Sequence, residues 1–279
     1  MTVAVVTDST AYLPADLVEA SHVTVVPVRV VIGGVGFDEG VGVTSEGVAE
    51  ALRHWRPVST SRPSPSAFLA AYTAAAESGA DAVVSVHLSG EMSGTVASAE
   101  LAAKEAPVPV RVVDSRTIGM AQGFGALSGA EAAAAGASLD DVERAVDERC
   151  ASTSAFFYVD TLEYLRRGGR IGSAAAMLGS ALAVKPLLHL VDGRIAPLEK
   201  VRTTSRALAR LEEVAVERSA DLPVDLAVHH LANPARAEQL AARLSARIPG
   251  LRRLVVSEVG AVVGAHVGPG MLAVAVAPV

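Results

Sequence analysis

The first half of the chain alternates short β-branched runs with longer alanine-rich stretches, and this alternation constrains the fold more than any other feature of the sequence. The short runs resemble buried strands, whereas the longer stretches carry apolar residues at helical spacing. Alternation of this kind predicts a mostly parallel, Rossmann-like sheet with helices on both faces. The predicted strands are Val3–Val6, Val23–Val31, Ala82–His87 and Val110–Val113, and the predicted helices are Thr44–Trp55, Ser66–Ser78, Thr95–Ala106, Gln122–Ala135 and Leu139–Cys150.

After Cys150 the pattern becomes that of an α+β lobe. Asp192-Gly193 is typical of a tight hairpin turn. The predicted strands are Ala155–Val159, Val184–Leu190, Ile195–Glu199, Leu222–His229, Arg252–Ser257 and Leu272–Val276, and the predicted helices are Thr161–Arg167, Ala174–Ala181, Thr203–Ser219 and Pro234–Ile248. We therefore expect an α/β protein of two lobes, with an N-terminal α/β lobe at 1–155 and a C-terminal α+β lobe with a mixed or antiparallel sheet at 156–279. A cleft between two such lobes is a natural place for a ligand.

Charge and composition exclude several classes of protein. A net charge of −6 argues against general nucleic-acid binding, which requires a basic footprint. Cys150 is the only cysteine, which excludes a disulfide within the chain and fits a reducing cytoplasm. The N-terminus has neither the basic region nor the long apolar run of a signal peptide, and we find no apolar segment suited to span a bilayer. We expect a cytoplasmic protein without stable membrane insertion.

Hydroxyl side chains gather where the predicted strands end. They occur in Thr7–Thr10, Ser89–Thr95 and Asp114–Thr117, and Ser59–Ser64 leads directly into a predicted helix. Ligands of a parallel α/β lobe bind beyond the carboxyl ends of its strands, where helix N-termini favour anions. Together these segments predict a polar patch for an anion, although a helix cap is the better interpretation of Ser64 and Thr95 taken singly.

His266 stands in a run of glycines that extends from Gly260 to Gly270 and includes Pro269. Glycines allow close approach of the backbone to a ligand, and proline fixes a turn. We therefore expect the imidazole on a pinned loop, suited to bind one polar atom at the end of an apolar site. A core histidine is the alternative interpretation.

A second run, Tyr164–Gly172, combines arginines with paired glycines, and more basic residues follow it: Arg194, Lys200, Arg202, Arg206 and Arg210. This local basic excess suits a phosphoryl group or an acidic partner surface. A solvated helix face is the better interpretation for Arg206 and Arg210. For Arg170 and Arg202 both interpretations stay open.

A serine hydrolase is one alternative function, with Ser93 as nucleophile, His266 as base and Asp8 or Asp114 as the orienting carboxylate. The glycine before Ser93 stands one residue too early for Gly-x-Ser-x-Gly. The sequence also lacks a phosphate-binding loop signature, and His229-His230 would point to opposite faces of a strand. We predict no catalytic residue, no metal and no cofactor, and we keep a carrier of another small anionic ligand as a further alternative.

Taken in order, several short motifs resemble those of the DegV family along essentially the whole chain. The motifs are Asp8-Ser-Thr10, Thr60-Ser61-x-Pro63-Ser-Pro65, Ser93-Gly-Thr95, Tyr164-Leu-Arg-Arg-Gly-Gly-Arg-Ile-Gly172, Lys185-Pro186 and Gly264-Ala-His-Val-Gly-Pro-Gly270. Members of that family include the fatty-acid-binding subunits of bacterial fatty acid kinase. The resemblance departs at Arg62, where the family commonly has Gln, at Gly90-Glu-Met92, which is less rich in serine, and at Val96, where an aromatic is common.

The resemblance implies two α/β lobes and a long-chain fatty acid buried as the ligand. Its carboxylate would be bound by Thr60, Ser61 and Ser93, with His266 nearby, and Arg170 and Arg202 would lie near the phosphoryl-transfer or partner surface. It further implies a non-catalytic carrier that presents the fatty acid to a separate kinase for acyl-phosphate formation.

Overall fold

The computed structural model describes residues 1–279 apart from residues 55, 179–184 and 221. Its contacts divide the chain into two compact units: unit 1 comprises Met1–Arg29 and Ser61–Ser152, and unit 2 comprises Val30–Thr60 and Thr153–Val279. Residues 30–60 thus group with unit 2. The sequence instead predicts one division of the chain, into domains at 1–155 and 156–279, and this division stays a prediction.

Unit 1 is built on a parallel sheet with the strand order β2-β1-β6-β7. Its strands are β1 (Val3–Asp8), β2 (Thr24–Val26), β6 (Ala82–His87) and β7 (Val110–Asp114). Its helices are η1 (Ser9–Ala11), α1 (Ala15–Ser21), α3 (Pro65–Glu77), α4 (Thr95–Ala103), α5 (Met120–Ala134) and α6 (Leu139–Ser152). The predicted parallel sheet is confirmed.

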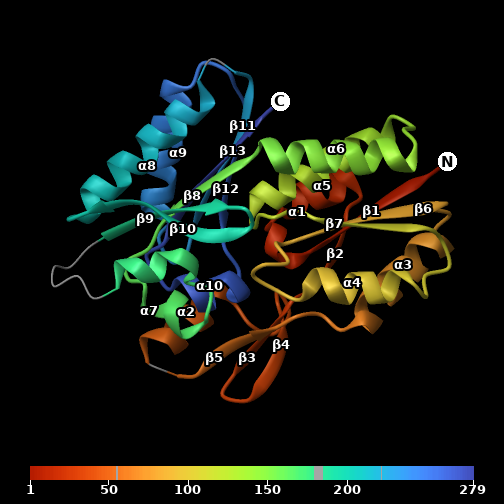
Figure 1. Ribbon diagram of the computed structural model, residues 1–279, viewed down its shortest axis with the longest axis horizontal. Coiled ribbons are helices and arrows are strands. Elements are labelled where there is room, and N and C mark those ends of the chain that lie inside the picture. The colour runs from red at the N-terminus through yellow and green to blue at the C-terminus, as the bar shows by residue number, and fades with distance from the viewer. Residues whose placement is uncertain (55, 179–184, 221) are drawn as a thin grey trace. The chain divides into compact units, whose positions relative to one another are not determined.

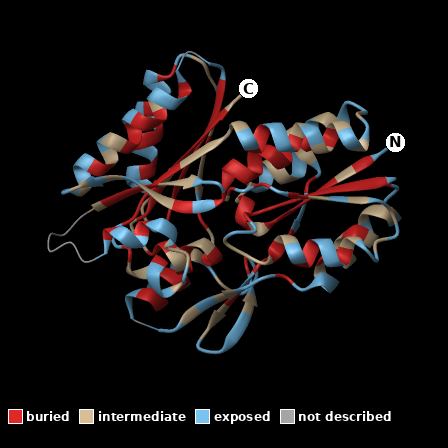
Figure 2. Ribbon diagram, viewed as in Figure 1, coloured by how far each residue is buried: buried red, intermediate tan, exposed pale blue. Residues whose placement is uncertain are grey.

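Helices α5 and α6 lie on one side of this sheet, and α3 and α4 lie on the other (Figure 1). Alternate residues of the strands pack against different helices. Val83 packs with Phe68 and Tyr72 of α3, whereas the next residue, Val84, packs with Val142 of α6 and its neighbours. Every residue of β6 is buried, as Figure 2 shows for the centre of this sheet. A strand covered on both faces needs apolar residues at successive positions, which explains why these strands read as continuous valine-rich runs.

Unit 2 contains a six-stranded mixed sheet with the strand order β10-β9-β8-β13-β11-β12. Its strands are β8 (Ser154–Tyr158), β9 (Lys185–Val191), β10 (Arg194–Val201), β11 (Val224–His230), β12 (Leu251–Glu258) and β13 (Leu272–Pro278). Strand β11 pairs in parallel with β12 and antiparallel with β13, which confirms the predicted mixed sheet. The amphipathic helices α8 (Thr204–Ser219) and α9 (Pro234–Arg247) bury Leu211 and Leu240 against this sheet.

The predicted β9–β10 hairpin is also confirmed. Strands β9 and β10 pair antiparallel around Asp192 and Gly193, whose φ angles are 51° and 79°. Positive φ at both turn residues matches the twist of the flanking strands, and Asp-Gly adopts it at low cost.

The predicted strand Val23–Val31 is wrong as one element, because the chain breaks at Pro27 into β2 and β3 (Arg29–Ile32). Proline has no backbone N–H for a ladder, and the N–H of Val28 donates instead to Ser9 Oγ at 3.0 Å. Strand β3 joins β4 (Val35–Asp38) and β5 (Val58–Ser61) in a three-stranded sheet with the order β4-β3-β5.

The hydroxyl segment 59–64 begins in β5 of the small sheet and then leads into α3, the helix expected after it. The helix predicted at Ala174–Ala181 is a 3-10 helix, η2 (Gly172–Met177). The parts of the predictions that fall on residues 55, 179–181 and 184 lie outside the described residues.

Candidate functional site

His266 lies near the end of α10 (Ala261–Val267), so the prediction of a loop at this residue is wrong. Ala261, Val262, Gly264, Ala265 and Val267 are buried, which shows that the small apolar residues serve helix packing. The turn follows the helix, where Gly268 and Gly270 have φ angles of 73° and 89°. Glycine tolerates these left-handed angles, whereas other residues are strained there. The glycine-rich run therefore describes the exit from a helix rather than the support of His266.

Helix α10 packs against α2 (Ser45–Arg53) and α7 (Glu163–Arg167) within unit 2. Its first turn is anchored by Glu39, a buried carboxylate whose Oε1 accepts the N–H of Val262 at 2.8 Å. A carboxylate is favourable at this position because it satisfies an unpaired N–H and meets the positive end of the helix dipole. This contact spans 223 residues of sequence and attaches the segment 30–60 to the helix that carries His266.

Thr60 and His266 are hydrogen-bonded within unit 2. Thr60 Oγ1 lies 2.9 Å from His266 Nε2, and the pair is partly buried. Thr60 belongs to β5, the strand whose position the sequence did not predict. The structure therefore joins two of the predicted head-group residues and does so through the small three-stranded sheet.

The other ring nitrogen of His266 is buried and is among the few buried polar side-chain atoms of the described residues that have no hydrogen-bond partner. It lies against Gly168: a Cβ added at Gly168 would be 2.0 Å from Nδ1 and 2.8 Å from Cε1. Only glycine allows an approach this close. The arginine-glycine and histidine-glycine runs, about a hundred residues apart in the sequence, therefore meet at this ring.

Burial lowers the pKa of His266 to about 4, and the nearby charge of Arg170 adds to this effect. The imidazole is therefore neutral at neutral pH and carries one N–H. A buried N–H without an acceptor is rare, so the proton belongs on Nε2, where it is donated to Thr60 Oγ1. This arrangement leaves the hydroxyl hydrogen of Thr60 available for another acceptor.

Of the two predicted arginines, Arg170 lies in this corner of unit 2. Its Nη1 donates to the carbonyl oxygen of Gly168 at 2.6 Å, on the residue that touches His266. Arg202 is exposed at the bend between β10 and α8. Arg210 is paired with Glu199, Glu213 and Glu217, which confirms the interpretation of that residue as part of a solvated face.

Lys185 anchors the turn that follows α10. Its Nζ donates to Asp160 Oδ1 at 3.1 Å, and Tyr158 donates to the same carboxylate. Burial raises the pKa of Asp160, but these donors outweigh it and the pKa is lowered overall. A Cβ at Gly270 would lie 2.2 Å from Asp160 Oδ2, so glycine is required for the turn to reach this carboxylate. Lys185 of the Lys185-Pro186 motif thus has a structural role, because it binds the carboxylate of Asp160.

Ser61 and Ser93 belong to unit 1. Ser93 Oγ lies 2.8 Å from Thr95 Oγ1, and Ser61 Oγ donates to the carbonyl of Arg62 at 3.4 Å. Ser64 caps α3 by accepting the N–H of Ala67, as predicted. The capping role predicted for Thr95 is wrong, because Gly94 is the N-cap of α4 and Thr95 is its first helical residue.

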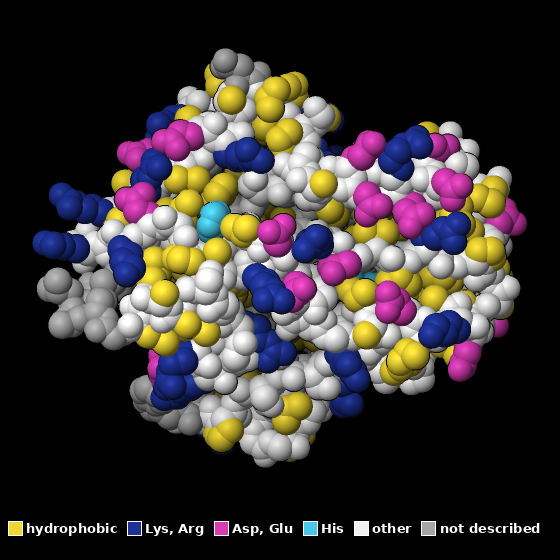
Figure 3. Space-filling view, in the orientation of Figure 1, with side chains coloured by type: hydrophobic (Ala, Val, Ile, Leu, Met, Phe, Trp, Pro, Cys, Tyr) yellow, Lys and Arg dark blue, Asp and Glu magenta, His cyan; other side chains and the backbone are white. Residues whose placement is uncertain are grey.

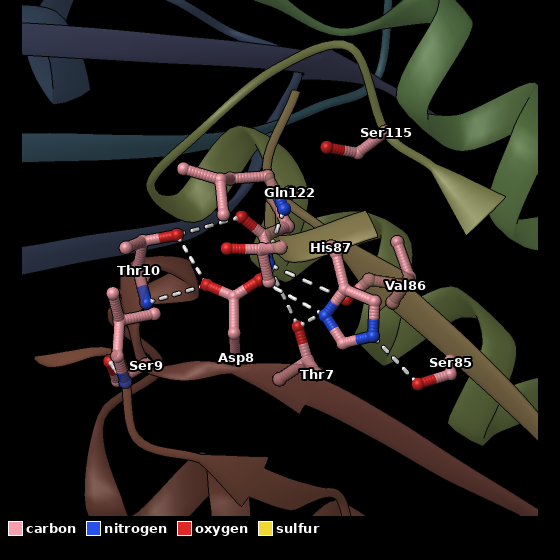
Figure 4. A network of polar contacts seen from close by, with 12 residues as sticks. Thr7, Asp8, Ser9, Thr10, Ser85, Val86, His87, Ser115 and Gln122 are labelled. Atoms are coloured by element: carbon pink, nitrogen blue, oxygen red, sulfur yellow. Dashed lines mark hydrogen bonds and ion pairs between the residues drawn. The ribbon is translucent and has the colours of Figure 1, made fainter. Parts of the chain in front are cut away.

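Asp8 belongs to a buried polar network in unit 1 that the sequence did not reveal (Figure 4). Asp8 Oδ2 lies 3.1 Å from His87 Nδ1 and accepts the N–H of Leu88 at 3.0 Å and an N–H of Gln122 at 3.1 Å. Burial raises the pKa of Asp8, but His87, Thr10 and Leu88 outweigh it and lower the pKa overall. The sequence gives one sign of this network, because the polar residues Ser85 and His87 stand in an otherwise apolar strand.

Ser85, His87 and Tyr72 are fully buried, so this part of the network does not reach the protein surface. His87 Nε2 lies 2.7 Å from Ser85 Oγ, which accepts the hydroxyl of Tyr72 at 2.8 Å. Burial raises the pKa of Tyr72 to about 12, so the phenol stays protonated and donates. Every link has a donor and an acceptor, which is the condition under which a buried polar network stabilises a fold.

These contacts bear on the hydrolase alternative. A triad needs a carboxylate on the base nitrogen that does not face the nucleophile. His266 Nδ1 has no hydrogen-bond partner among the described residues, Asp8 is bonded to His87, and Asp114 accepts the N–H groups of Gly90 and Arg116. The orienting contact of a Ser93–His266–Asp triad is therefore missing from this structure.

Among the described residues, no helix is long and apolar enough to cross a membrane, and no group of three or more His, Cys, Asp or Glu side chains is placed to hold a metal ion. On the face drawn in Figure 3, basic side chains lie beside acidic ones over much of the surface.

The sequence model described as "uncharacterised protein, DegV family" matches residues 2–279. The DegV domain-containing protein SCO2569 of Streptomyces coelicolor is 60% identical over 274 residues, which cover 98% of each chain.

Two solved structures share the fold over the full length of both chains. A DegV family protein from Thermus thermophilus, described by its fatty acid binding, has a TM-score of 0.95 and 33% identity. DegV of Bacillus subtilis, described as a fatty acid binding protein, has a TM-score of 0.92 and 36% identity. With a family model that matches almost every residue and relatives this similar along their whole length, the chain belongs to the DegV family.

Proposed function

We propose that the protein binds a long-chain fatty acid and that Thr60 and His266 hold its carboxylate. The observation that carries the proposal is the hydrogen bond between Thr60 Oγ1 and His266 Nε2. It orients a neutral hydroxyl donor at a partly buried position, and the similar proteins from Thermus thermophilus and Bacillus subtilis are described as fatty acid binding. Ser61 and Ser93, in unit 1, are the further donors that the family resemblance supplies.

The energetics of such a ligand favour this donor set. A palmitoyl-length tail contributes on the order of 10 kcal/mol on burial, at about 0.8 kcal/mol per methylene. The head group opposes burial, because an unpaired buried carboxylate costs several kcal/mol and must receive hydrogen bonds. Thr60 supplies one such bond, and His266 keeps its hydroxyl hydrogen pointed away from the ring.

We further propose that the protein is a cytoplasmic, non-catalytic carrier that needs no cofactor and presents the bound fatty acid to a separate kinase for acyl-phosphate formation. Arg170 supports this part of the proposal, because its guanidinium lies next to the Gly168–His266 contact and suits a phosphoryl group. Arg202, exposed on the same unit, is the candidate for contact with the partner.

Lipid extraction and mass spectrometry of the purified protein test the binding step. We expect a long-chain fatty acid in the extract, or its uptake when palmitate is added to delipidated protein. Thr60→Ala should weaken palmitate binding about tenfold by removing a hydrogen bond to a charged group, whereas Thr60→Ser should retain most of the affinity.

Thr44→Ala is the matched control for this series. Thr44 caps α2 in the same unit, so its loss costs stability of about 1 kcal/mol and should leave palmitate affinity unchanged. A wild-type protein that takes up no fatty acid, or a Thr60→Ala variant that binds as tightly as the wild type, contradicts the proposal.

The carrier role has its own test. The loaded protein is mixed with ATP and a separate fatty acid kinase, and acyl phosphate is trapped with hydroxylamine as the hydroxamate. We expect product only when all components are present, and less of it with Arg170→Gln at unchanged palmitate affinity. Hydroxamate formed without the kinase would show that the protein itself catalyses the transfer.

A further inference from the structure

Arg62 lies across the loop that carries Ser93. A Cβ added at Gly94 would be 2.5 Å from Arg62 Nη1, 3.0 Å from Cδ and 3.4 Å from Cζ, so the guanidinium rests on the backbone of Gly94. Both residues belong to unit 1. The φ angle of Gly94 is −78°, which any residue adopts, so glycine is required here for the space it leaves rather than for its backbone conformation.

The guanidinium has no hydrogen-bond or ion-pair partner among the described residues. Acidic side chains hold arginines elsewhere in the molecule: Glu163 binds Arg166 and Arg167, and Glu212 binds Arg243 and Arg247. Arg62 thus presents a full positive charge that nothing described in the protein neutralises. Its neighbours in the sequence and in space are the two candidate head-group serines of this unit, Ser61 before it and Ser93 before Gly94.

We propose that Arg62 is a specificity-determining residue that selects ligands with an ionised head group. This inference rests on the proposed fatty acid binding and changes its chemistry: the hydroxyl donors orient the carboxylate, and Arg62 supplies the charge that neutral donors lack. Guanidinium matches the planar carboxylate with two parallel N–H donors, and charge-assisted hydrogen bonds are about twice as strong as neutral ones. Fatty alcohols and esters of the same tail gain nothing from this contact.

The geometry offers two independent ways to remove the contact. Arg62→Gln removes the charge, whereas Gly94→Ala keeps the charge and displaces the guanidinium from the loop, because the new methyl group would occupy its place. Lys104→Gln is the matched control, since Lys104 is an exposed cation at the other end of α4 and its removal changes the net charge by the same amount.

The experiment measures binding of palmitate and of hexadecanol to the delipidated full chain at low and at high salt. We expect Arg62→Gln and Gly94→Ala each to weaken palmitate binding about tenfold at low salt and to leave hexadecanol binding unchanged. Arg62→Lys should fall between the wild type and Arg62→Gln, because lysine keeps the charge and loses the paired donors.

Equal losses for palmitate and hexadecanol, or palmitate affinity in Arg62→Gln equal to that of Lys104→Gln, would overturn the selection by charge while leaving fatty acid binding intact. A wild-type protein that binds neither ligand would instead overturn the proposed function itself. Circular dichroism and thermal unfolding of each variant confirm that a loss of binding does not reflect a loss of fold.

Discussion

Two histidines in this molecule sit in opposite polar surroundings. His87 in unit 1 has a partner on each ring nitrogen, Asp8 on one side and Ser85 on the other, and all three residues are fully buried. His266 in unit 2 has Thr60 on one nitrogen and no partner on the other, and it is only partly buried.

The difference separates a structural use of histidine from one suited to a ligand. A satisfied buried network stabilises and specifies a fold, because each of its groups is costly to leave unpaired. An unsatisfied buried polar atom needs another explanation, and close packing on a glycine supplies it at His266. Both ring nitrogens of His87 are paired within the protein, so this histidine offers no hydrogen bond to a ligand. At His266, by contrast, the hydroxyl hydrogen of Thr60 can still be donated to a ligand.

The largest effect is expected for Asp8→Ala. The substitution removes the acceptor of His87, Leu88 and Gln122 at once, so we expect a loss of about 3–5 kcal/mol in the free energy of unfolding, measured with urea. Asp141→Ala, which removes a half-exposed carboxylate of the same unit, is the control and should change the midpoint little. Equal effects of the two substitutions would show that the network contributes nothing of its own.

Gly168→Ala tests the other histidine. The added methyl group would collide with His266 Nδ1, so we expect a loss of about 1–3 kcal/mol in stability together with weaker palmitate binding. Gly169→Ala separates this collision from backbone strain, because Gly169 has a φ of 69° and nothing within 4 Å of an added Cβ. If Gly169→Ala weakened palmitate binding as much as Gly168→Ala, contact with the ring would not be the cause.

The pKa of His266 predicts a pH dependence of stability. Its pKa is about 4 in the folded protein and 6.5 in the unfolded chain, so the unfolded chain binds more protons between these values. The contribution of His266 is complete above pH 6.5 and is lost as the pH falls toward 4, which amounts to about 1–2 kcal/mol between about pH 7 and about pH 5.

Urea unfolding of wild type and His266→Asn at both pH values isolates this contribution. His229, whose pKa burial also lowers to about 4, is present in both proteins and cancels in the difference. An unchanged pH dependence in His266→Asn would mean that the pKa of His266 is the same in the folded protein as in the unfolded chain.

The smallest effect is expected for Glu163→Gln. Glu163 pairs with Arg166 and Arg167 on an exposed face of α7, where water and salt weaken ion pairs. We expect no resolved change in thermal unfolding and no change in palmitate affinity. A clear loss of affinity would show that this ion-pair group contributes to palmitate binding.

Much of the candidate site could be predicted from the sequence, because its residues stand in runs with a local signal. Runs that contain glycine include Gly168 and the end of the helix that carries His266, and runs of hydroxyl residues include Thr60 and Ser93. The pairings could not be predicted. Glu39 binds Val262 and Thr60 binds His266, although more than two hundred residues separate the partners of each pair. A local sequence pattern does not indicate contacts between residues so far apart. The Asp8–His87–Ser85 chain was missed for a related reason, since a polar residue in an apolar strand reveals its partner only in the folded sheet.

The sequence by itself determined most of the elements and their class: valine-rich runs between alanine-rich helices predict a parallel sheet covered on both faces, and Asp192-Gly193 predicts a hairpin. The tertiary structure decided which elements belong to each of the two units. Pro27 ends one strand, and the chain then contributes residues 30–60 to the unit that contains His266. Periodicity reports which face of an element is buried, but only packing decides which distant element covers it. For this reason His266 was recognisable in the sequence, whereas its bond to Thr60 and its contact with Gly168 required the fold.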